Sequence, residues 1–295
     1  MKKLGREHVI YAHSRTDRPV MQADPGELFS VETYDCYQGQ MLPENARYEN
    51  CDRSRINPAT GPVYITGAMP GDTLRIEIIR IETGLVGIVD CGTPGSVLED
   101  QYSCVTVKRL PVEEQTLIYE GRRVPIDPMI GIIGVAPAGT PVSTLSPGAH
   151  GGNLDCRKIK EGAVLYLPVA TEGALLSIGD LHAVMGDGEV GNCGVEIEGS
   201  VTVRTEVIPG TGRDYIMLEN QTEWISIASA ESLDLAAEMA TRQMNDFLRK
   251  EKGMSPVDAG ILLTLAGNLA VCQVVNPLKT VRLELSKAWI GSWMS

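Results

Sequence analysis

A glycine-rich stretch at residues 179–194 reads GDLHAVMGDGEVGNCG and holds one of only four histidines in the chain. His182 follows Asp180 by two positions, and Asp187 and Glu189 come shortly after it. Imidazole and carboxylate groups are the ligand types that zinc and similar divalent cations take in proteins. Side chains two residues apart on a β-strand point to the same face, so Asp180 and His182 can approach one ion. The glycines on both sides let the backbone come close to a small cavity.

Two other stretches place polar side chains within otherwise apolar sequence. SPGAHGGNLDCRKI contains His150, Asn153 and Asp155, and FSVETYDCYQGQ contains Asp35 in a strand-like run where a carboxylate is unexpected. The alternative for all these positions is ordinary turn chemistry, because Gly-Asp and Gly-Asn pairs are typical of turns. A lone histidine on a strand is also usually a structural residue. Residue types alone leave both interpretations open.

Other types of hydrolytic site find little support in the sequence. It contains no EF-hand loop, no HExxH motif and no GxSxG elbow. Cys193 lies near Glu196 and is the candidate for a cysteine nucleophile. No lysine lies near it in sequence, and glycine follows it directly, so we expect Cys193 not to be the nucleophile. In NPATGPVYITGAMPGD, Asn57 or Thr60 could line a pocket, but the density of Pro and Gly favours an architectural role.

Most of the chain predicts β-strands. Apolar and polar residues alternate in several segments, and each segment is bounded by Gly, Pro or Asp turns such as MPGD, PAGT and IPGTGRD. The predicted strands include residues 73–84, 103–110, 162–170, 173–178 and 194–208. Many short strands with frequent turns predict a mainly β body, a sandwich or a barrel-like fold.

The last part of the chain predicts helices. Residues 232–253 show apolar residues at helical spacing, with Ser232 as the N-cap and Gly253 as the stop. A second helix is predicted from Ser255, with Pro256 in its first turn, to the Asn276-Pro277 pair.

Within this second helix, AGILLTLAGNLAVCQVV at residues 259–275 is the longest apolar stretch. It contains Thr, Asn and Gln and is shorter than the ~20 apolar residues of a membrane span, so we interpret it as a buried core helix. The predicted organisation is a β-rich catalytic body over residues 1–228 and a smaller α/β C-terminal section with two helices over residues 229–295, packed on the body.

Composition limits the partners and the location. The net charge is −12 and the pI about 4.9, so we expect no nucleic-acid partner. The seven cysteines are an odd number without a CxxC pair, which is typical of reduced thiols in a cytoplasmic protein. The first residues lack the apolar region of a signal peptide, and we expect no membrane association.

These motifs together resemble those of the acetamidase/formamidase family. The resemblance covers nearly the whole chain and includes HSRTDRP, NPATGPVYITGAMPGDTL, GGNLD and GDLHAVMGDGEV. It implies a mainly β fold with a smaller α/β C-terminal part. It also implies hydrolysis of short aliphatic amides, such as formamide and acetamide, to a carboxylate and ammonia. The family is associated with a divalent metal, here expected to be zinc first and calcium second.

The resemblance also implies that the active site includes His182, Asp180, Asp187, Glu189, Asn153 and Asp155, joined by Asp35, but it does not assign the metal ligands. The roles that follow are our hypotheses from the chemistry of these residues. We expect His182, Asp35 and Asp155 to bind the metal, with His150 as a further ligand. Glu189 is the expected general base of a metal-activated water, with Asp187 and Asp180 as alternative catalytic carboxylates. The expected substrate-binding groups are Asn153 and the backbone of Gly152 and Gly188.

The same residues are also compatible with a second class of protein. In this alternative, the chain is a non-catalytic β-sandwich that a metal stiffens and that binds a small ligand or sugar. Aromatic residues make up only 5% of the chain, which counts against stacking on sugar rings. We therefore expect an amidase whose partners are a small neutral amide and further copies of the chain in a homo-oligomer.

Overall fold

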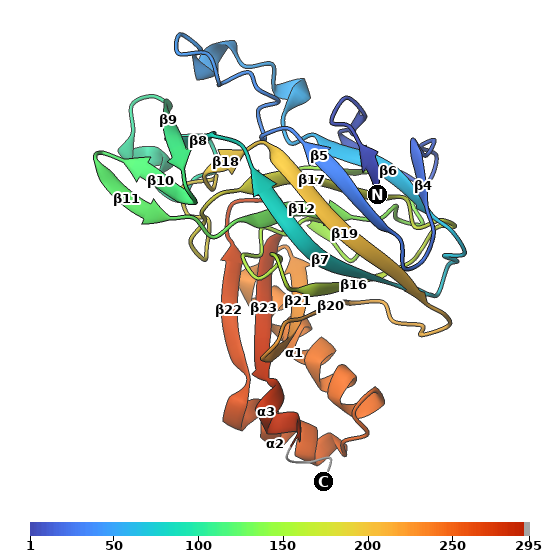
Figure 1. Ribbon diagram of the computed structural model, residues 1–295. Helices are drawn as coiled ribbons and strands as arrows, with labels where there is room; N and C mark the ends of the chain where they lie inside the picture. Colours follow the sequence, from blue (N-terminus) through green and yellow to red (C-terminus); the bar gives the residue numbers. More distant parts are fainter. Residues whose placement is uncertain (292–295) are drawn as a thin grey trace.

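The computed structural model describes residues 1–291, and its body consists of two large β-sheets packed face to face (Figure 1). Both sheets have free ends, so the body is an open sandwich rather than a closed barrel. A large aliphatic core that includes Phe29, Leu74 and Ile178 draws on strands of both sheets. The prediction of a mainly β sandwich with a smaller helical C-terminal section is confirmed.

The first sheet has nine strands. In spatial order they are β1 (Lys2–Leu4), β5 (Leu28–Thr33), β19 (Gly199–Ile208), β7 (Thr73–Thr83), β16 (Val164–Pro168), β20 (Ile216–Glu219), β21 (Glu223–Ala230), β23 (Lys279–Ser286) and β22 (Asn268–Gln273).

The second sheet has twelve strands, and a separate small sheet has two. The twelve are β11 (Arg122–Pro125), β10 (Thr116–Tyr119), β9 (Thr106–Glu113), β8 (Val86–Cys91), β18 (Glu196–Ile197), β17 (Leu176–His182), β12 (Met129–Gly134), β15 (Gly151–Asn153), β14 (Pro147–Gly148), β6 (Ala59–Ile65), β2 (Val9–Ile10) and β4 (Met21–Ala23). The small sheet pairs β3 (Ala12–His13) with β13 (Val142–Ser143).

Strand β7 illustrates why these residues form strands. Its alternation buries Leu74, Ile76 and Ile78 and leaves Arg75 and Glu77 at the surface. The alternation then slips, and the structure shows an irregular register between β7 and β19 at this point. A β-bulge adds one residue to one strand, so the side chains that follow it point to the opposite face of the sheet from the one the earlier alternation predicts.

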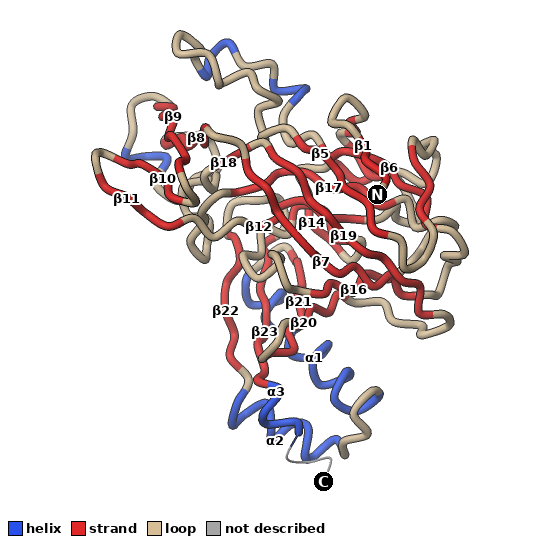
Figure 2. The backbone as a smooth tube through the Cα atoms, viewed as in Figure 1, coloured by secondary structure: helices blue, strands red, loops and turns tan. Residues whose placement is uncertain are grey.

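The nine-stranded sheet continues beyond the sandwich into the C-terminal section (Figure 2). Helices α1 (Leu233–Lys250) and α2 (Pro256–Ala266) pack beside β21 and β23, and the short α3 (Lys287–Gly291) follows β23. This arrangement encloses a second apolar core around Met244, Phe247 and Leu283. The division into residues 1–228 and 229–295 stays a prediction, and its boundary falls within β21.

The prediction of helix α1 is confirmed, although the helix ends at Lys250, before the predicted stop at Gly253. Ser232 is its N-cap and accepts a hydrogen bond from the backbone N–H of Leu235. Ser255 caps α2 in the same way through the N–H of Asp258, and Pro256 occupies the first turn.

The prediction of one buried helix over residues 259–275 is wrong. Helix α2 ends at Ala266, Gly267 follows, and the rest of the segment forms β22 at the edge of the sheet. A short apolar run does not distinguish a helix from a strand, and pairing with β23 decided the outcome here. The helix is also only partly buried, since Val257 is 69% and Leu265 64% exposed.

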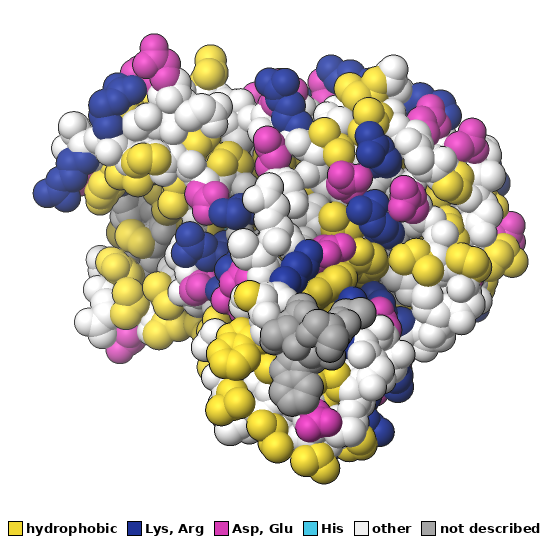
Figure 3. Space-filling view, turned by 60° about the horizontal axis from the view of Figure 1, so that its bottom comes forward, with side chains coloured by type: hydrophobic (Ala, Val, Ile, Leu, Met, Phe, Trp, Pro, Cys, Tyr) yellow, Lys and Arg dark blue, Asp and Glu magenta, His cyan; other side chains and the backbone are white. Residues whose placement is uncertain are grey.

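Figure 3 shows the end of the molecule that carries these helices. Apolar side chains gather there, while acidic and basic side chains are interspersed over the rest of the face in view. Within residues 1–291, no helix has the length and apolar character needed to cross a bilayer.

Candidate active site

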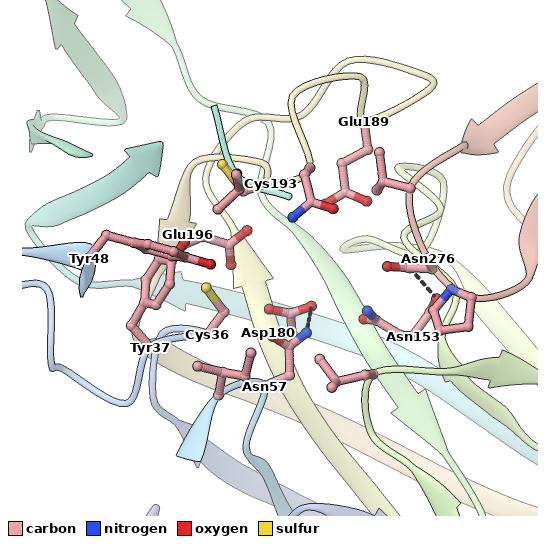
Figure 4. Close-up of a pocket in the computed structure, with 16 residues that line it drawn as sticks. Cys36, Tyr37, Tyr48, Asn57, Asn153, Asp180, Glu189, Cys193, Glu196 and Asn276 are labelled. Carbon is pink, nitrogen blue, oxygen red and sulfur yellow. Dashed lines mark hydrogen bonds between the residues drawn. The ribbon is translucent and has the colours of Figure 1, made fainter. Parts of the chain in front are cut away.

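A cavity of about 210 Å³ opens where loops from the sandwich meet the turn between β22 and β23 (Figure 4). Its lining includes Asp180, Glu189 and Glu196, together with Asn153 and Asn276. The carboxylates come from β17, from the loop after it and from β18, and Asn276 comes from the C-terminal section. Segments distant in sequence therefore build one small chamber with both polar and apolar side chains in its lining.

His182 lies fully buried beside this chamber, at the end of β17. Its Nε2 atom is 3.2 Å from Glu196 Oε1, 3.7 Å from Asp180 Oδ2 and 3.9 Å from Asp155 Oδ1. The side chains of Asp180 and His182 thus converge on one region, as their spacing predicts.

The backbone is adapted to this convergence. Asp155, Asp180 and Glu189 all have positive φ angles, between 44° and 57°, in the left-handed region that non-glycine residues rarely adopt. Residues in such conformations cluster at functional sites. A Cβ atom at Gly131 would lie 2.6 Å from Asp155 Oδ1, and one at Gly194 would lie 2.5 Å from His182 Nδ1. Glycine at both positions is therefore required for the side chains to meet.

Burial of so many acidic groups shifts their proton affinities. Burial raises the pKa of Glu196 to about 8 and that of Asp155 to about 6. Burial, reinforced by the charge of Asp155, raises the pKa of Glu189 well above its ordinary value. Burial would lower the pKa of His182, but Glu196 and then Asp180 raise it well above the ordinary value. These raised pKa values mean that part of the cluster holds protons when no cation is bound, and a cation bound among the carboxylates would favour their ionised forms.

The polar atoms of this cluster lack enough partners within the protein. His182 Nδ1 and Nε2, Asp155 Oδ1 and Glu189 Oε2 are buried without a hydrogen-bond partner, as are oxygens of Asp180 and Glu196. Buried polar groups are normally paired, so unpaired ones at a cavity mark a place for a ligand.

Two sets of metal-ligating atoms lie side by side in the cluster. The first comprises Asp155, His182 and Glu189, and the second comprises Cys36, Asp180 and Glu196; within each set the atoms lie within 4.8 Å of one another. Nitrogen and carboxylate oxygen donors of this kind fit zinc, and the carboxylates also fit calcium.

Several other predicted site residues lie elsewhere. Asp35 is buried, but its carboxylate accepts hydrogen bonds from the backbone N–H groups of Tyr37 at 2.8 Å and Gly39 at 3.0 Å. Both oxygens of Asp187 pair with Arg282 at 2.7 Å. The Asp35 carboxylate is thus used to fix a loop, and that of Asp187 to form an ion pair.

His150 packs against a second buried histidine, with 5.1 Å between its ring centroid and that of His13. Burial lowers the pKa of His150 to about 4, and burial together with His150 lowers that of His13 to about 3. Both imidazoles are therefore neutral near pH 7. Neither belongs to the two sets of ligating atoms found among the described residues.

The two predicted glycines have backbone roles. Gly188 donates its N–H to the carbonyl of Cys272 at 2.9 Å, so this N–H is not directed at a substrate. Gly152 lies in β15, between β12 and β14. Asn153, in contrast, lines the cavity with its buried Oδ1 unpaired.

Sequence reasoning missed three residues of the site and preferred the wrong role for a fourth. In the sequence, Glu196 resembles the polar residue of an alternating strand, and Cys36 is only the neighbour of the expected ligand Asp35. Asn57 is a possible pocket residue for which the sequence favours an architectural role, yet it lines the cavity and donates to Asp180 Oδ2 at 3.4 Å. Asn276 was read only as the end of a helix, and no local signal links it to residues more than a hundred positions earlier.

A β-sandwich that encloses a buried histidine among carboxylates, beside a chamber for a small ligand, defines a class of protein with a candidate cation site next to a small-ligand pocket. Comparison with protein families gives the particular family. The chain belongs to the acetamidase/formamidase family, whose model matches residues 11–141 and 138–276.

Solved structures with the same fold are similar over almost the whole chain. An acetamidase from Bacillus halodurans is 42% identical with a TM-score of 0.95, covering 98% of this chain and 99% of that one. A predicted acetamidase/formamidase from Thermoanaerobacter tengcongensis is 38% identical with a TM-score of 0.96, covering 99% and 98%.

A putative formamidase of Schizosaccharomyces pombe is 28% identical over 260 residues, which is 66% of this chain and 62% of the relative. The chain therefore spans about three fifths of the length of this curated relative.

Proposed function

We propose that the protein hydrolyses short aliphatic amides, such as formamide and acetamide, to a carboxylate and ammonia. The observation that carries the proposal is the unpaired His182–carboxylate cluster beside a cavity of only about 210 Å³. Pockets for drug-sized ligands are ~300–1,000 Å³, so this cavity suits a substrate of a few heavy atoms. Relatives named acetamidase and formamidase support the choice of substrate.

We propose that His182, Asp155 and Asp180 hold a divalent cation, with zinc preferred over calcium because of the imidazole donor. Such a cation, when bound, polarises the amide carbonyl and makes water more acidic. Asp35 is left out of this ligand set because backbone N–H groups engage both its oxygens.

Glu189 is the proposed general base. Its buried Oε2 has no partner in the protein, and the carboxylate can take a proton from the attacking water when a bound cation offsets the burial and the Asp155 charge that raise its pKa. The water oxygen bonds to the carbonyl carbon, the carbon–nitrogen bond breaks, and Glu189 returns the proton to the leaving nitrogen. Asn153 is the proposed acceptor of a hydrogen bond from the substrate NH₂ group, because it lines the cavity and its Oδ1 has no partner in the protein.

Two further assignments belong to this proposal. Seven free cysteines support a reducing compartment such as the cytoplasm. Exposed apolar residues on α2, including Val257, Ile261 and Leu265, support a homo-oligomer that buries them.

The proposal is tested by measuring ammonia release from formamide and acetamide before and after removal of metal. We expect turnover by the protein as purified, its loss after prolonged dialysis against a strong chelator, and its recovery with added zinc. Full activity in protein verified as metal-free would contradict the metal mechanism. Bound metal without ammonia release would leave the non-catalytic β-sandwich as the better description.

Cys193 provides a second test, directed at a thiol nucleophile. Its thiol hydrogen-bonds to the backbone of Asp90, and burial raises its pKa well above the ordinary value, so the reactive thiolate is disfavoured. We expect Cys193→Ala to retain acetamide turnover within about tenfold of the wild type. The exposed Cys104→Ala is the control. A loss of more than about a thousandfold in a folded Cys193→Ala protein would point to covalent catalysis.

A further inference from the structure

The turn between β22 and β23 reaches into the active site through Asn276. Its Nδ2 donates to Asp155 Oδ2 at 2.6 Å and to the backbone carbonyl of Asn153 at 3.1 Å. The same Asp155 carboxylate keeps its other oxygen, Oδ1, unpaired and 3.9 Å from His182 Nε2. Asn276 therefore engages one oxygen and leaves the other free for a ligand.

This turn is held rigidly from within by Gln273, which is fully buried. Its Oε1 accepts the backbone N–H groups of Val275 and Asn276, both at 2.9 Å. Its Nε2 donates to the carbonyl of Leu278 at 2.7 Å and to Thr280 Oγ1 at 2.8 Å. The amide of Asn276 is thus presented to Asp155 from a fixed backbone rather than from a free loop.

A second contact connects the same hairpin to the loop that carries Glu189. Arg282 on β23, itself 3% exposed, forms the two 2.7 Å bonds to Asp187. The backbone reinforces this link, since Gly188 donates to Cys272 at 2.9 Å and accepts from Val274 at 3.0 Å. Asp187 and Gly188 immediately precede Glu189, so the hairpin binds the backbone segment that leads to the proposed base.

We infer that the β22–β23 hairpin is the positioning device of the active site, with Asn276 orienting Asp155 and the Arg282–Asp187 pair orienting Glu189. Asn276, Arg282 and Asp187 are positioning residues rather than catalytic ones. The inference rests on the proposed function, because Asp155 and Glu189 are its ligand and its base. Groups that orient metal ligands in this way are typically worth about 10- to 100-fold in metal affinity or activity.

The test of the first contact is Asn276→Ala, with Asn220→Ala as the matched control. Asn220 also lies in a hairpin turn of this sheet and donates to a carboxylate, Glu223 Oε2, at 2.9 Å. We expect Asn276→Ala to bind zinc about 10- to 100-fold more weakly in competition with a chelating dye. We expect Asn220→Ala to bind zinc like the wild type. Asn276→Gln keeps a polar amide but displaces it by one methylene group. It replaces Asn276→Ala in this measurement if the alanine variant does not fold.

The test of the second contact is Asp187→Asn, with Glu251→Gln as its control. Glu251 is likewise a half-exposed carboxylate paired with a buried arginine, Arg213. We expect Asp187→Asn to lower kcat for acetamide about tenfold or more with KM little changed, and to keep the acidic limb of the pH–rate profile. Loss of that limb would make Asp187 the base itself and overturn the inference for this contact.

Equal zinc affinity in Asn276→Ala and the wild type would overturn the inference for the first contact. So would equal losses of zinc affinity in Asn276→Ala and Asn220→Ala. Failure of the proposed function is distinguishable, because it would appear in the wild type itself as absent ammonia release, while zinc affinity still compares the variants.

Discussion

Replacing His182 with alanine is expected to remove both the metal and the activity. The imidazole is the only nitrogen donor in the described cluster of ligating atoms, and it is fully buried. Without it, carboxylates whose pKa values burial already raises would face one another with no nearby imidazole. Loss of a ligand weakens the site itself, and lost Lewis-acid catalysis is worth several kcal/mol. We expect zinc below one tenth of an equivalent and a fall in turnover of about a thousandfold or more.

The measurements are metal content by elemental analysis and ammonia release from acetamide. His13→Ala is the control, because it also removes a buried imidazole with unpaired nitrogens but lies outside the cluster. It should keep its zinc. If His182→Ala retained stoichiometric metal, the ligand assignment would be wrong, and His150 would have to be tested in its place.

Replacing Glu189 with glutamine is expected to separate proton transfer from metal binding. The amide keeps the shape and hydrogen-bonding reach of the carboxylate but cannot accept the proton of the attacking water. We expect a fall in kcat of ~10²–10⁴-fold with little change in KM, the size typical of general acid–base catalysis. Metal content should stay at the wild-type level.

Two outcomes would contradict this assignment. Glu189 lies within 4.8 Å of ligating atoms of Asp155 and His182, so loss of metal in Glu189→Gln would identify it as a ligand. Glu196, which lines the same cavity, would then become the first candidate for the proton acceptor, ahead of Asp180. If Glu189→Gln kept near-wild-type metal content and turnover, the Glu189 carboxylate would have only a structural role in the turn. Glu198→Gln, which alters a surface ion pair with Arg6, is the control.

The sandwich was predictable because its signals are local. Alternation in residues such as Leu74, Ile76 and Ile78 records which face of β7 is buried, and the turn residues mark where each strand ends. Helix α1 was predictable for the same reason, since Ser232 caps it. The edge strand β22 was not, because its apolar run resembles a helix until β23, which follows it in sequence, pairs with it.

The site was predictable only in part, for a related reason. His182, Asp180 and Glu189 lie within a few residues of one another, and the structure brings them together with Asp155. Spacing does not reveal which partner each carboxylate meets. Asp187 precedes Glu189 by two residues yet turns to Arg282, 95 positions away. Long-range contacts of this kind leave no periodic pattern in the sequence.

The hairpin that holds Asp155 also has a consequence for the order in which the protein matures. Asn276 is made 121 residues after Asp155, an interval on the order of ten seconds at ordinary rates of translation. During that time the nascent sandwich carries its histidine and carboxylates without the contacts that orient them. We therefore expect a polypeptide released by premature termination before residue 276 to contain most of the chemical groups of the proposed site but to bind zinc more weakly than the full chain. On the proposed function, full activity begins only after the chain's late strands have been translated and have joined the sheet.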